Sequence, residues 1–263
     1  MGINNEARSW DLALSTYDNV SIDTDDFVDY IHHYKGGKWD GIYAFFANHP
    51  DLLESYEYFW LVDDDIQASA SQVEELFSHV EKYQFEIAQP ALTPDSYYAH
   101  RLTLQCPIFN HRHTNFVELM MPVLSRAVLK QVLPYFRNTQ SGLGLDWLWN
   151  GFVSRPNETI AIIDRISMSH YRPRNKHLRG RMEKAGIFAH EEKEATIKNW
   201  KLNKIYPIAF SGMLLNGKCI RNRLAMSCLM TKNYWMLRRS ICRPAWSLLG
   251  LINFSLRQAF SKL

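Results

Sequence analysis

The chain has 263 residues, and 46% of them are hydrophobic, which is enough to bury one substantial core. Its four cysteines lack a paired metal-binding spacing and are too few for a disulfide scaffold, so we expect a reducing compartment. The net charge of +3 is unevenly distributed, because residues 195–263 carry twelve Lys or Arg and no acidic residue. The rest of the chain is therefore acidic overall. This acidic main part and the absence of a nucleic-acid motif argue against an RNA- or DNA-binding protein.

Targeting segments are not visible in this sequence. The first fifteen residues have neither a basic start nor an apolar run, and no stretch reaches the roughly 18 apolar residues of a membrane span. We therefore expect a cytoplasmic protein without a transmembrane helix.

Short apolar runs alternate with helical stripes over the first 175 residues, a pattern typical of an α/β fold. In chain order we expect a strand at 10–15, helices at 24–34 and 38–47, a strand at 58–62, a helix at 70–83, strands at 85–89, 102–106 and 116–124, helices at 125–136 and 146–153, and a strand at 159–166. The composition shifts near residue 193. We therefore expect a main domain over residues 1–193 and a basic, apolar helical extension over residues 194–263.

The most informative stretch is residues 58–66, where an apolar, strand-like run ends in Asp63, Asp64 and Asp65. Three adjacent carboxylates repel one another, and a divalent cation removes that cost. If strand geometry continues, Asp63 and Asp65 point to the same side. Two such oxygen ligands suit one Mg²⁺ or Mn²⁺ ion, with a diphosphate completing the coordination shell.

The same stretch has two other interpretations. A capping box at residues 71–74 would make the carboxylates the solvated start of the helix at 70–83. The acidic spacing also resembles a calcium-binding loop, but Ala68 stands where that loop needs glycine. The metal site and the helix cap remain the main alternatives.

The basic tail is also rich in aromatic and aliphatic residues. This mixture is typical of a segment that lies on an anionic membrane surface, where each cation contributes about 1 kcal/mol. We expect peripheral attachment to such a surface through residues 195–263. The alternative is a helical extension that packs on the main domain or on another subunit.

Several segments in order resemble a known family. They are residues 58–66, 87–92, 116–126, 142–146 and 162–164, followed by His170. Together they resemble the domain of unknown function 707 family, which in turn is similar to glycosyltransferases of the GT-A fold. The resemblance spans residues 9–173. It implies a mixed, mainly parallel sheet with helices on both faces, and a transferase that uses a nucleotide-diphospho-sugar donor.

The resemblance also implies metal ligands. The acidic triplet corresponds to the D-x-D motif, with Asp65 as the direct ligand, Asp63 as a ribose or metal contact and Asp64 as an auxiliary. His170 resembles the late histidine that many GT-A enzymes add to the metal shell, and its imidazole favours Mn²⁺ over Mg²⁺. A solitary histidine near a strand end can also be only a hydrogen-bonding residue. The cation would stabilise charge on the leaving nucleoside diphosphate.

Asp146 matches the acidic position that holds the catalytic base in inverting members of the fold. A helix start keeps a carboxylate ionised, so it could accept the proton of the acceptor hydroxyl. The alternative role is an N-cap after the flexible residues 142–144. Family motifs place another acid just before this one, where the chain has Leu145. This departure makes Glu118 a competing base or acceptor-binding residue.

Three further residues are candidates for the donor site. Asp18 follows the first strand and could contact the nucleotide base, Lys38 could reach a phosphate, and Arg172 could neutralise the diphosphate, unless its basic neighbourhood is merely solvated. A second polar cluster either shapes an acceptor pocket or covers a loop. It consists of His100, Arg101, His111, Arg112 and His113.

These observations predict a metal-dependent, inverting glycosyltransferase that acts on a glycan or lipid-linked acceptor in surface polysaccharide synthesis. The alternatives are a metal-dependent hydrolase or nucleotidyltransferase and a non-catalytic carbohydrate-binding protein.

Overall fold

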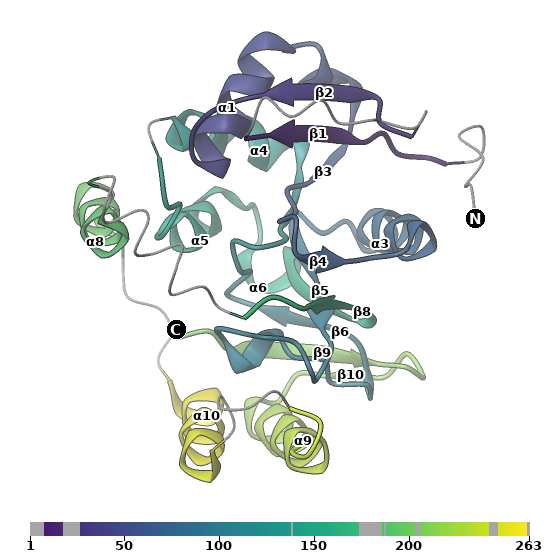
Figure 1. The fold of residues 1–263 in the computed structure, drawn as a ribbon. Helices are drawn as coiled ribbons and strands as arrows, with labels where there is room; N and C mark the ends of the chain where they lie inside the picture. The colour runs from purple at the N-terminus through teal and green to yellow at the C-terminus, as the bar shows by residue number, and fades with distance from the viewer. Residues whose placement is uncertain are drawn as a thin grey trace.

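The protein is a mixed α/β structure with one large central sheet flanked by helices (Figure 1). This computed structural model describes residues 8–17, 27–137, 139–173, 186, 188–202, 206–241 and 247–261. The expected α/β class is therefore confirmed. No helix in these described ranges is both long enough and apolar enough to cross a membrane.

The large sheet has the strand order β10-β9-β6-β8-β5-β7-β3, with β4 paired to β8 beside this path. Its strands are β3 (Tyr58–Trp60), β4 (Ile66–Gln67), β5 (Ile87–Leu92), β6 (Phe109–Thr114), β7 (Val123–Ser125), β8 (Ile160–His170), β9 (Ala209–Leu214) and β10 (Cys219–Ile220). Strands β5 and β8 run parallel, whereas the other neighbours in this sheet are antiparallel. The expectation of a mainly parallel sheet is therefore wrong, and the sheet is mixed.

A separate parallel pair precedes the large sheet. It consists of β1 (Ala13–Thr16) and β2 (Tyr30–His33). The expected strand at 10–15 is thus confirmed in outline, but the helix expected at 24–34 is wrong where its residues are described. In β2, burial alternates from residue to residue, with His32 buried and Ile31 exposed. A strand of this length contains too few residues for its hydrophobic pattern to distinguish the two-residue period of a strand from the 3.6-residue period of a helix.

Helix α3 (Ala70–Tyr83) has the predicted bounds, although its cap differs from the predicted one. The N-cap is Ser69, whose backbone N–H donates to Oε1 of Gln72 at 2.9 Å, and whose hydroxyl accepts from the N–H of Gln72. The side-chain amide of Gln72 also donates to the carbonyl of Ser167 in β8 at 2.8 Å. This bond and the burial of Leu76 and Val80 fix α3 against the sheet.

The remaining helices surround the sheet. They are α1 (Lys38–Asn48), α2 (Leu52–Ser55), α4 (Arg126–Val132), α5 (Leu145–Leu148), α6 (Pro156–Thr159), α8 (Ala189–Asn199), α9 (Arg223–Met236) and α10 (Leu248–Phe260). Short 3-10 turns continue α4 to Phe136 and α5 to Phe152. The helices expected at 38–47, 125–136 and 146–153 are therefore confirmed in outline.

Two expected strands are wrong, at 102–106 and over most of 116–124. Residues 101–103 form a 3-10 turn, and only Val123–Ser125 of the second stretch and its end pairs as a strand. The segment from Phe116 to Pro122 is irregular but buried, and its carbonyls accept hydrogen bonds from residues 38, 61 and 63. A buried apolar run of this length resembles a core strand in sequence, whatever its backbone does.

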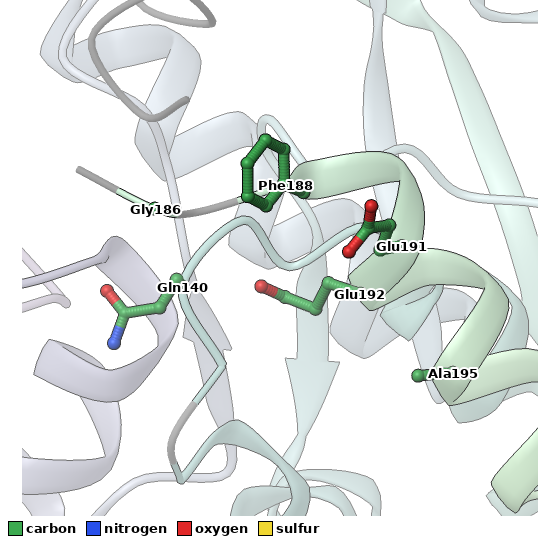
Figure 2. Close-up of a pocket in the computed structure, with 6 residues that line it drawn as sticks. All are labelled: Gln140, Gly186, Phe188, Glu191, Glu192 and Ala195. Atoms are coloured by element: carbon green, nitrogen blue, oxygen red, sulfur yellow. The ribbon is translucent and has the colours of Figure 1, made fainter. Parts of the chain in front are cut away.

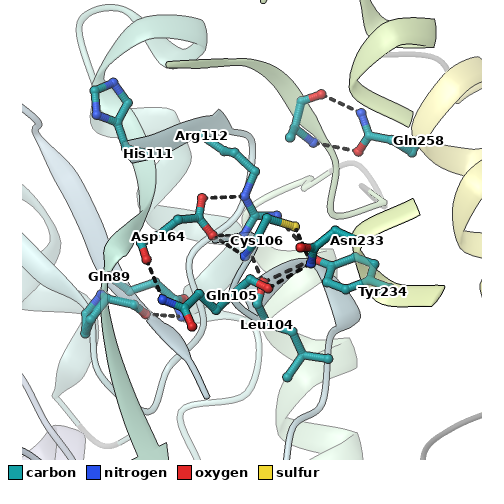
Figure 3. Close-up of polar contacts among 12 residues, drawn as sticks. Gln89, Leu104, Gln105, Cys106, His111, Arg112, Asp164, Asn233, Tyr234 and Gln258 are labelled. Atoms are coloured by element: carbon teal, nitrogen blue, oxygen red, sulfur yellow. Dashed lines mark hydrogen bonds and ion pairs between the residues drawn. The ribbon is translucent and has the colours of Figure 1, made fainter. Parts of the chain in front are cut away.

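Strand β6 was not predicted, because its sequence is polar. Its Arg112 is fully buried and donates from Nε and Nη2 to the carboxylate of Asp164 in β8 (Figure 3). His111 is also buried, with Nδ1 3.2 Å from Nε2 of His79 in α3. His111 and Arg112 therefore hold the sheet together, and the idea that they shape an acceptor pocket or cover a loop is wrong.

The C-terminal part joins the same sheet. Strand β9 pairs with β6, and α9 and α10 pack together against this end of the sheet (Figure 1). Gln258 of α10 bonds both backbone groups of Ala209 in β9, at 2.9 and 2.6 Å (Figure 3). The part expected to be a helical extension thus contains two sheet strands. A division between residues 193 and 194 remains a prediction.

Candidate functional site

The acidic triplet lies just beyond β3, and each of its carboxylates has a different partner. Asp63 lies 2.5 Å from Nζ of Lys38, and Asp64 lies 2.9 Å from Nη1 of Arg172. Oδ2 of Asp65 lies 3.2 Å from Nε2 of His170. The triplet is therefore compensated by three basic side chains, which come from α1, from β8 and from the residues that follow β8.

Lys38 is the first residue of α1, and its ammonium group reaches across to the end of β3. Besides Asp63, it donates to the carbonyls of Leu61 at 2.8 Å and Leu119 at 3.0 Å. The backbone N–H of Asp63 donates to the carbonyl of Met120 at 2.8 Å. Lys38 thus links the triplet to the irregular segment from Phe116 to Pro122.

Asp65 and His170 meet because β4 pairs with the end of β8, with Ile66 opposite His170. On its other side, Nδ1 of His170 lies 2.5 Å from the carbonyl of Tyr97. A histidine that donates Nδ1–H to a carbonyl presents the lone pair of Nε2 to a metal. Oδ1 of Asp65 is buried and has no hydrogen-bond partner within the described part of the chain.

The surroundings of this pair favour the charged forms of both side chains, a negative Asp65 and a positive His170. Burial alone would raise the pKa of Asp65, but the hydrogen bond and charge of His170 and the charge of Arg172 lower it overall. Burial alone would lower the pKa of His170, but hydrogen bonds with Asp65 and the Tyr97 carbonyl raise it overall. Asp65 is therefore held as a carboxylate facing an imidazole that readily accepts a proton.

A divalent cation would find two protein ligands here. Asp65 supplies oxygen atoms, one of which has no hydrogen-bond partner among the described residues, and His170 supplies a nitrogen. Among the described residues, no three His, Cys, Asp or Glu side chains converge on one point. Cations that act on phosphates often use one or two carboxylates and take their other ligands from substrate and water. The residues fit a cation bound in that manner.

Glu118 lies in the same region. It is buried, its backbone N–H donates to Oε1 of Gln89 at 2.6 Å, and its charge raises the pKa of His170. Gln89 belongs to the central strand β5. The sheet therefore holds the backbone of Glu118 near the Asp65–His170 pair.

Asp146 lies in the first turn of α5, on a buried face. The N-cap of α5 is Gly144, whose φ of +105° strongly favours glycine, so Asp146 is not the N-cap itself. Burial raises the pKa of Asp146 to about 6, although Lys193 and the backbone N–H groups of Gly144 and Trp147 oppose this shift. Its Oδ1 atom has no hydrogen-bond partner among the residues that the structure describes.

Two contacts relate Asp146 to the rest of the site. Asn150, in the turn that continues α5, donates to the carbonyl of Asn115 at 2.8 Å. Asn115 directly precedes the irregular segment that carries Glu118. The side chain of Trp147 packs in the same apolar cluster as Trp60 and Met120. The candidate base and the acidic triplet are therefore connected through one buried segment.

Helix α8 covers the loop before Asp146. A carboxylate oxygen of Glu192 accepts hydrogen bonds from the backbone N–H groups of Ser141 and Gly142, both at 3.1 Å. Nζ of Lys193 lies 4.7 Å from the ring centroid of Trp147. A pocket of about 370 Å³ lies beside α8. Its described lining residues, drawn in Figure 2, include Glu192 but none of the predicted site residues.

Sequence reasoning missed the residues that position the site. Tyr97 and Ser96 bond to His170 through a carbonyl and a hydroxyl, at 2.5 and 3.1 Å, and no sequence signal identifies such contacts. Gln89 could have been noticed, because it is a polar residue within an otherwise apolar run. Asp18, the predicted contact to the nucleotide base, lies outside the described residues.

Comparison with known proteins supports the family resemblance. Residues 7–115 match the family model described as "Protein of unknown function (DUF707)". The matched span contains β1, the acidic triplet, α3, β5 and β6, so the predicted family is confirmed over this part of the chain. No curated protein and no solved structure matches the chain.

Proposed function

From the DUF707 match over residues 7–115 and the geometry of the acidic triplet, we propose that this protein is a metal-dependent glycosyltransferase with a GT-A-like fold. The observation that carries the proposal is the pair formed by Asp65 and His170, with one buried carboxylate oxygen of Asp65 left without a described partner. A divalent cation would satisfy that oxygen and would also bind the diphosphate of a nucleotide.

The donor would bind at the triplet. Asp65 and His170 would hold Mn²⁺ or Mg²⁺, which stabilises negative charge on the leaving diphosphate when bound. Arg172 is half-exposed beside Asp64 and would add a fixed positive charge near that diphosphate. Lys38 keeps Asp63 compensated and, through its carbonyl contacts, holds the segment leading to Glu118 in place.

Asp146 would act as the base of an inverting transfer from a nucleotide-diphospho-sugar to a glycan or lipid-linked acceptor. With a pKa of about 6, it is mostly ionised at neutral pH and yet basic enough to take the proton of an acceptor hydroxyl. Oδ1 is the atom that would take this proton, because it has no partner in the described part of the protein. Glu118 would orient the acceptor or serve as the competing base.

The C-terminal part would bring the enzyme to an anionic membrane surface, as a peripheral protein on the cytoplasmic side. Helix α10 exposes an apolar stripe along its whole length, made of Leu248, Leu249, Ile252, Leu256 and Phe260. Arg238 and Arg239 follow α9, the helix that packs against α10. This combination supports a role in the synthesis of a surface polysaccharide, whose lipid-linked precursors lie at such a surface.

A thermal-shift screen would test the donor site. Nucleoside diphosphates and nucleotide sugars are added with and without Mn²⁺ to the intact protein, to Asp65→Ala and to Asp51→Ala, an exposed aspartate at the start of α2. We expect one nucleotide to raise the melting temperature only with the metal, and Asp65→Ala alone to abolish the effect.

The products of turnover separate this proposal from its alternatives. A transferase releases a nucleoside diphosphate, whereas a hydrolase or nucleotidyltransferase releases phosphate or pyrophosphate. A carbohydrate-binding protein would bind its glycan equally well after Asp65→Ala. No stabilisation of the folded protein by any nucleotide would contradict the proposal.

A further inference from the structure

A second, smaller cavity of about 170 Å³ lies where three distant parts of the chain meet. Its lining comes from residues 99–102, from residues 206–207 and from α10. The polar side chains among the lining residues are those of His100, Arg101, Tyr206, Asn253 and Arg257. None of the described lining residues is acidic, so the cavity has a positive electrostatic character.

The part of the cavity lining formed by residues 99–102 contacts the buried segment that carries Glu118. The ring of His100 lies 4.5 Å from that of Phe116, two residues before Glu118. Tyr97, whose carbonyl contacts His170, lies two residues before Ala99, the first lining residue of the cavity. The segment that positions the candidate metal ligand thus continues directly into the cavity.

The geometry of α10 keeps the cavity open and directs basic groups toward it. Ser247 caps α10 by accepting a hydrogen bond from the N–H of Gly250 at 3.0 Å. A Cβ at Gly250 would lie 2.6 Å from Oγ of Ser247 and 3.3 Å from Nη2 of Arg101, so glycine leaves room for the helix cap and for the guanidinium group beside it. One turn beyond Asn253, the guanidinium of Arg257 lies 4.3 Å from the ring centroid of Tyr206, which holds it at the cavity.

We propose that Arg101 and Arg257 form a subsite for a phosphate group carried by the acceptor. Guanidinium groups suit phosphate because their planar N–H donors match its oxygens in pairs. Asn253 and His100 can add neutral hydrogen bonds. The assignment of the phosphate to an acceptor rests on the proposed function, whereas the anion subsite itself rests on the cavity.

Two sources can supply that phosphate. Asn253 and Arg257 are sequence neighbours of Ile252 and Leu256, which belong to the exposed apolar stripe of α10. A lipid phosphate would place its head group in the cavity and its chain along the stripe. A phosphorylated soluble glycan would use the cavity alone.

Titration calorimetry with inorganic phosphate tests the subsite. The proteins are the full chain, Arg101→Gln, Arg257→Gln and, as the matched control, Arg239→Gln, which removes an equal charge from an exposed position after α9. Because charge-assisted hydrogen bonds are lost, we expect Kd to rise by about tenfold or more in the first two variants and to stay unchanged in Arg239→Gln. Circular dichroism verifies that each variant is folded. Arg257 is exposed, so its replacement should leave the fold intact. Equal affinity in Arg257→Gln and the full chain, or equal losses in all three variants, would overturn the subsite.

Vesicles identify the source. Phosphatidylcholine vesicles with and without phosphatidic acid are offered to the full chain, to Arg257→Gln and, as the control in this experiment, to Arg155→Gln, which removes an equal charge from an exposed position outside the basic C-terminal part. A loss of phosphatidic acid binding confined to Arg257→Gln assigns the subsite to a lipid phosphate. Phosphate binding that depends on Arg257 without any such vesicle effect assigns it to a soluble acceptor.

Asp65→Ala separates the two proposals. This variant should bind phosphate as tightly as the full chain while losing the metal-dependent nucleotide response. Phosphate binding that depends on Arg257 in a protein that binds no nucleotide would refute the transferase and leave the anion subsite standing.

Discussion

Arg112 donates two hydrogen bonds to Asp164, at 2.7 and 2.8 Å, and neither side chain is exposed to solvent. The two residues join the neighbouring strands β6 and β8. Arg112 also donates to the carbonyl of Leu104 and to the hydroxyl of Tyr234, and Asp164 accepts from the N–H of Cys106. One buried ion pair therefore connects the centre of the sheet to α9.

Breaking this pair should destabilise the protein strongly. Arg112→Met leaves the Asp164 carboxylate buried without its cation, which typically costs about 3–5 kcal/mol. The control is Arg165→Met, because Arg165 forms an exposed pair with Glu75 that contributes about 1 kcal/mol or less. Urea unfolding measures both free energies. Similar losses in the two variants would show that the buried pair is not a main stabilising contact.

Asp146 should make the free energy of unfolding depend on pH in an unusual direction. Its pKa of about 6 in the folded protein lies above the ordinary 3.8, so the folded state binds the proton more tightly than the unfolded chain. Its contribution to stability is therefore complete below about pH 4, declines as the pH rises to about 6 and stays low above that.

Asp146→Asn should remove this contribution to the pH dependence. The variant should be more stable than the parent protein at pH 7 by up to about 3 kcal/mol, and the difference should vanish toward pH 4. Urea unfolding at several pH values measures it. If Asp146 is the catalytic base, the rate of glycosyl transfer by the parent protein should decrease at pH values below about 6, and Asp146→Asn should be inactive. A difference in stability that is independent of pH would contradict the raised pKa.

His170→Ala should weaken metal binding. The variant removes the nitrogen that faces Asp65, so we expect the Mn²⁺ affinity in the presence of nucleotide to fall by about tenfold or more. Mg²⁺, which prefers oxygen ligands, should lose less. His190→Ala, at an exposed position of α8, is the control. Titration calorimetry in each metal provides the measurement, and equal losses for both ions would argue against direct coordination by His170.

The apolar stripe of α10 should determine vesicle binding. Leu249 and Phe260 are 80% and 70% exposed, so replacing both by serine should change the fold little. Each loses about 2 kcal/mol of apolar burial in the membrane, and together they should weaken binding to anionic vesicles by at least tenfold. Leu215→Ser, an exposed leucine between β9 and β10, should have no effect on vesicle sedimentation. Unchanged sedimentation of the double variant would exclude this stripe as the membrane contact.

Local sequence predicted those elements whose own residues determine them. Helix α3 has a long apolar stripe, and both its first and last residues agree with the prediction. Strand β6 could not be predicted from its polar residues, because Arg112 is buried only through a partner that lies 52 residues later. The irregular segment that includes Val117 and Met121 has strand-like composition, but its partners are supplied by the tertiary structure.

The site was predictable to a similar degree. The position of the triplet at the end of a strand follows from composition, but the expectation that Asp63 and Asp65 share one side assumed a continuing strand. Strand β3 ends at Trp60, so alternation no longer applies at residue 63. Asp63 then meets Lys38 and Asp65 meets His170, two partners that only the folded chain brings near.

The pairing of β9 with β6 constrains the order in which the protein can fold. One edge of β6 stays open until residues 209–214 have emerged from the ribosome. Until then, the nascent chain exposes the backbone edge of β6, and this open edge can pair with strands of other chains. Residues 209–214 therefore complete the central sheet only late in synthesis. Truncation at residue 193 would leave an aggregation-prone fragment, so side-chain substitutions on α10 are the appropriate way to study how this part of the molecule meets a membrane.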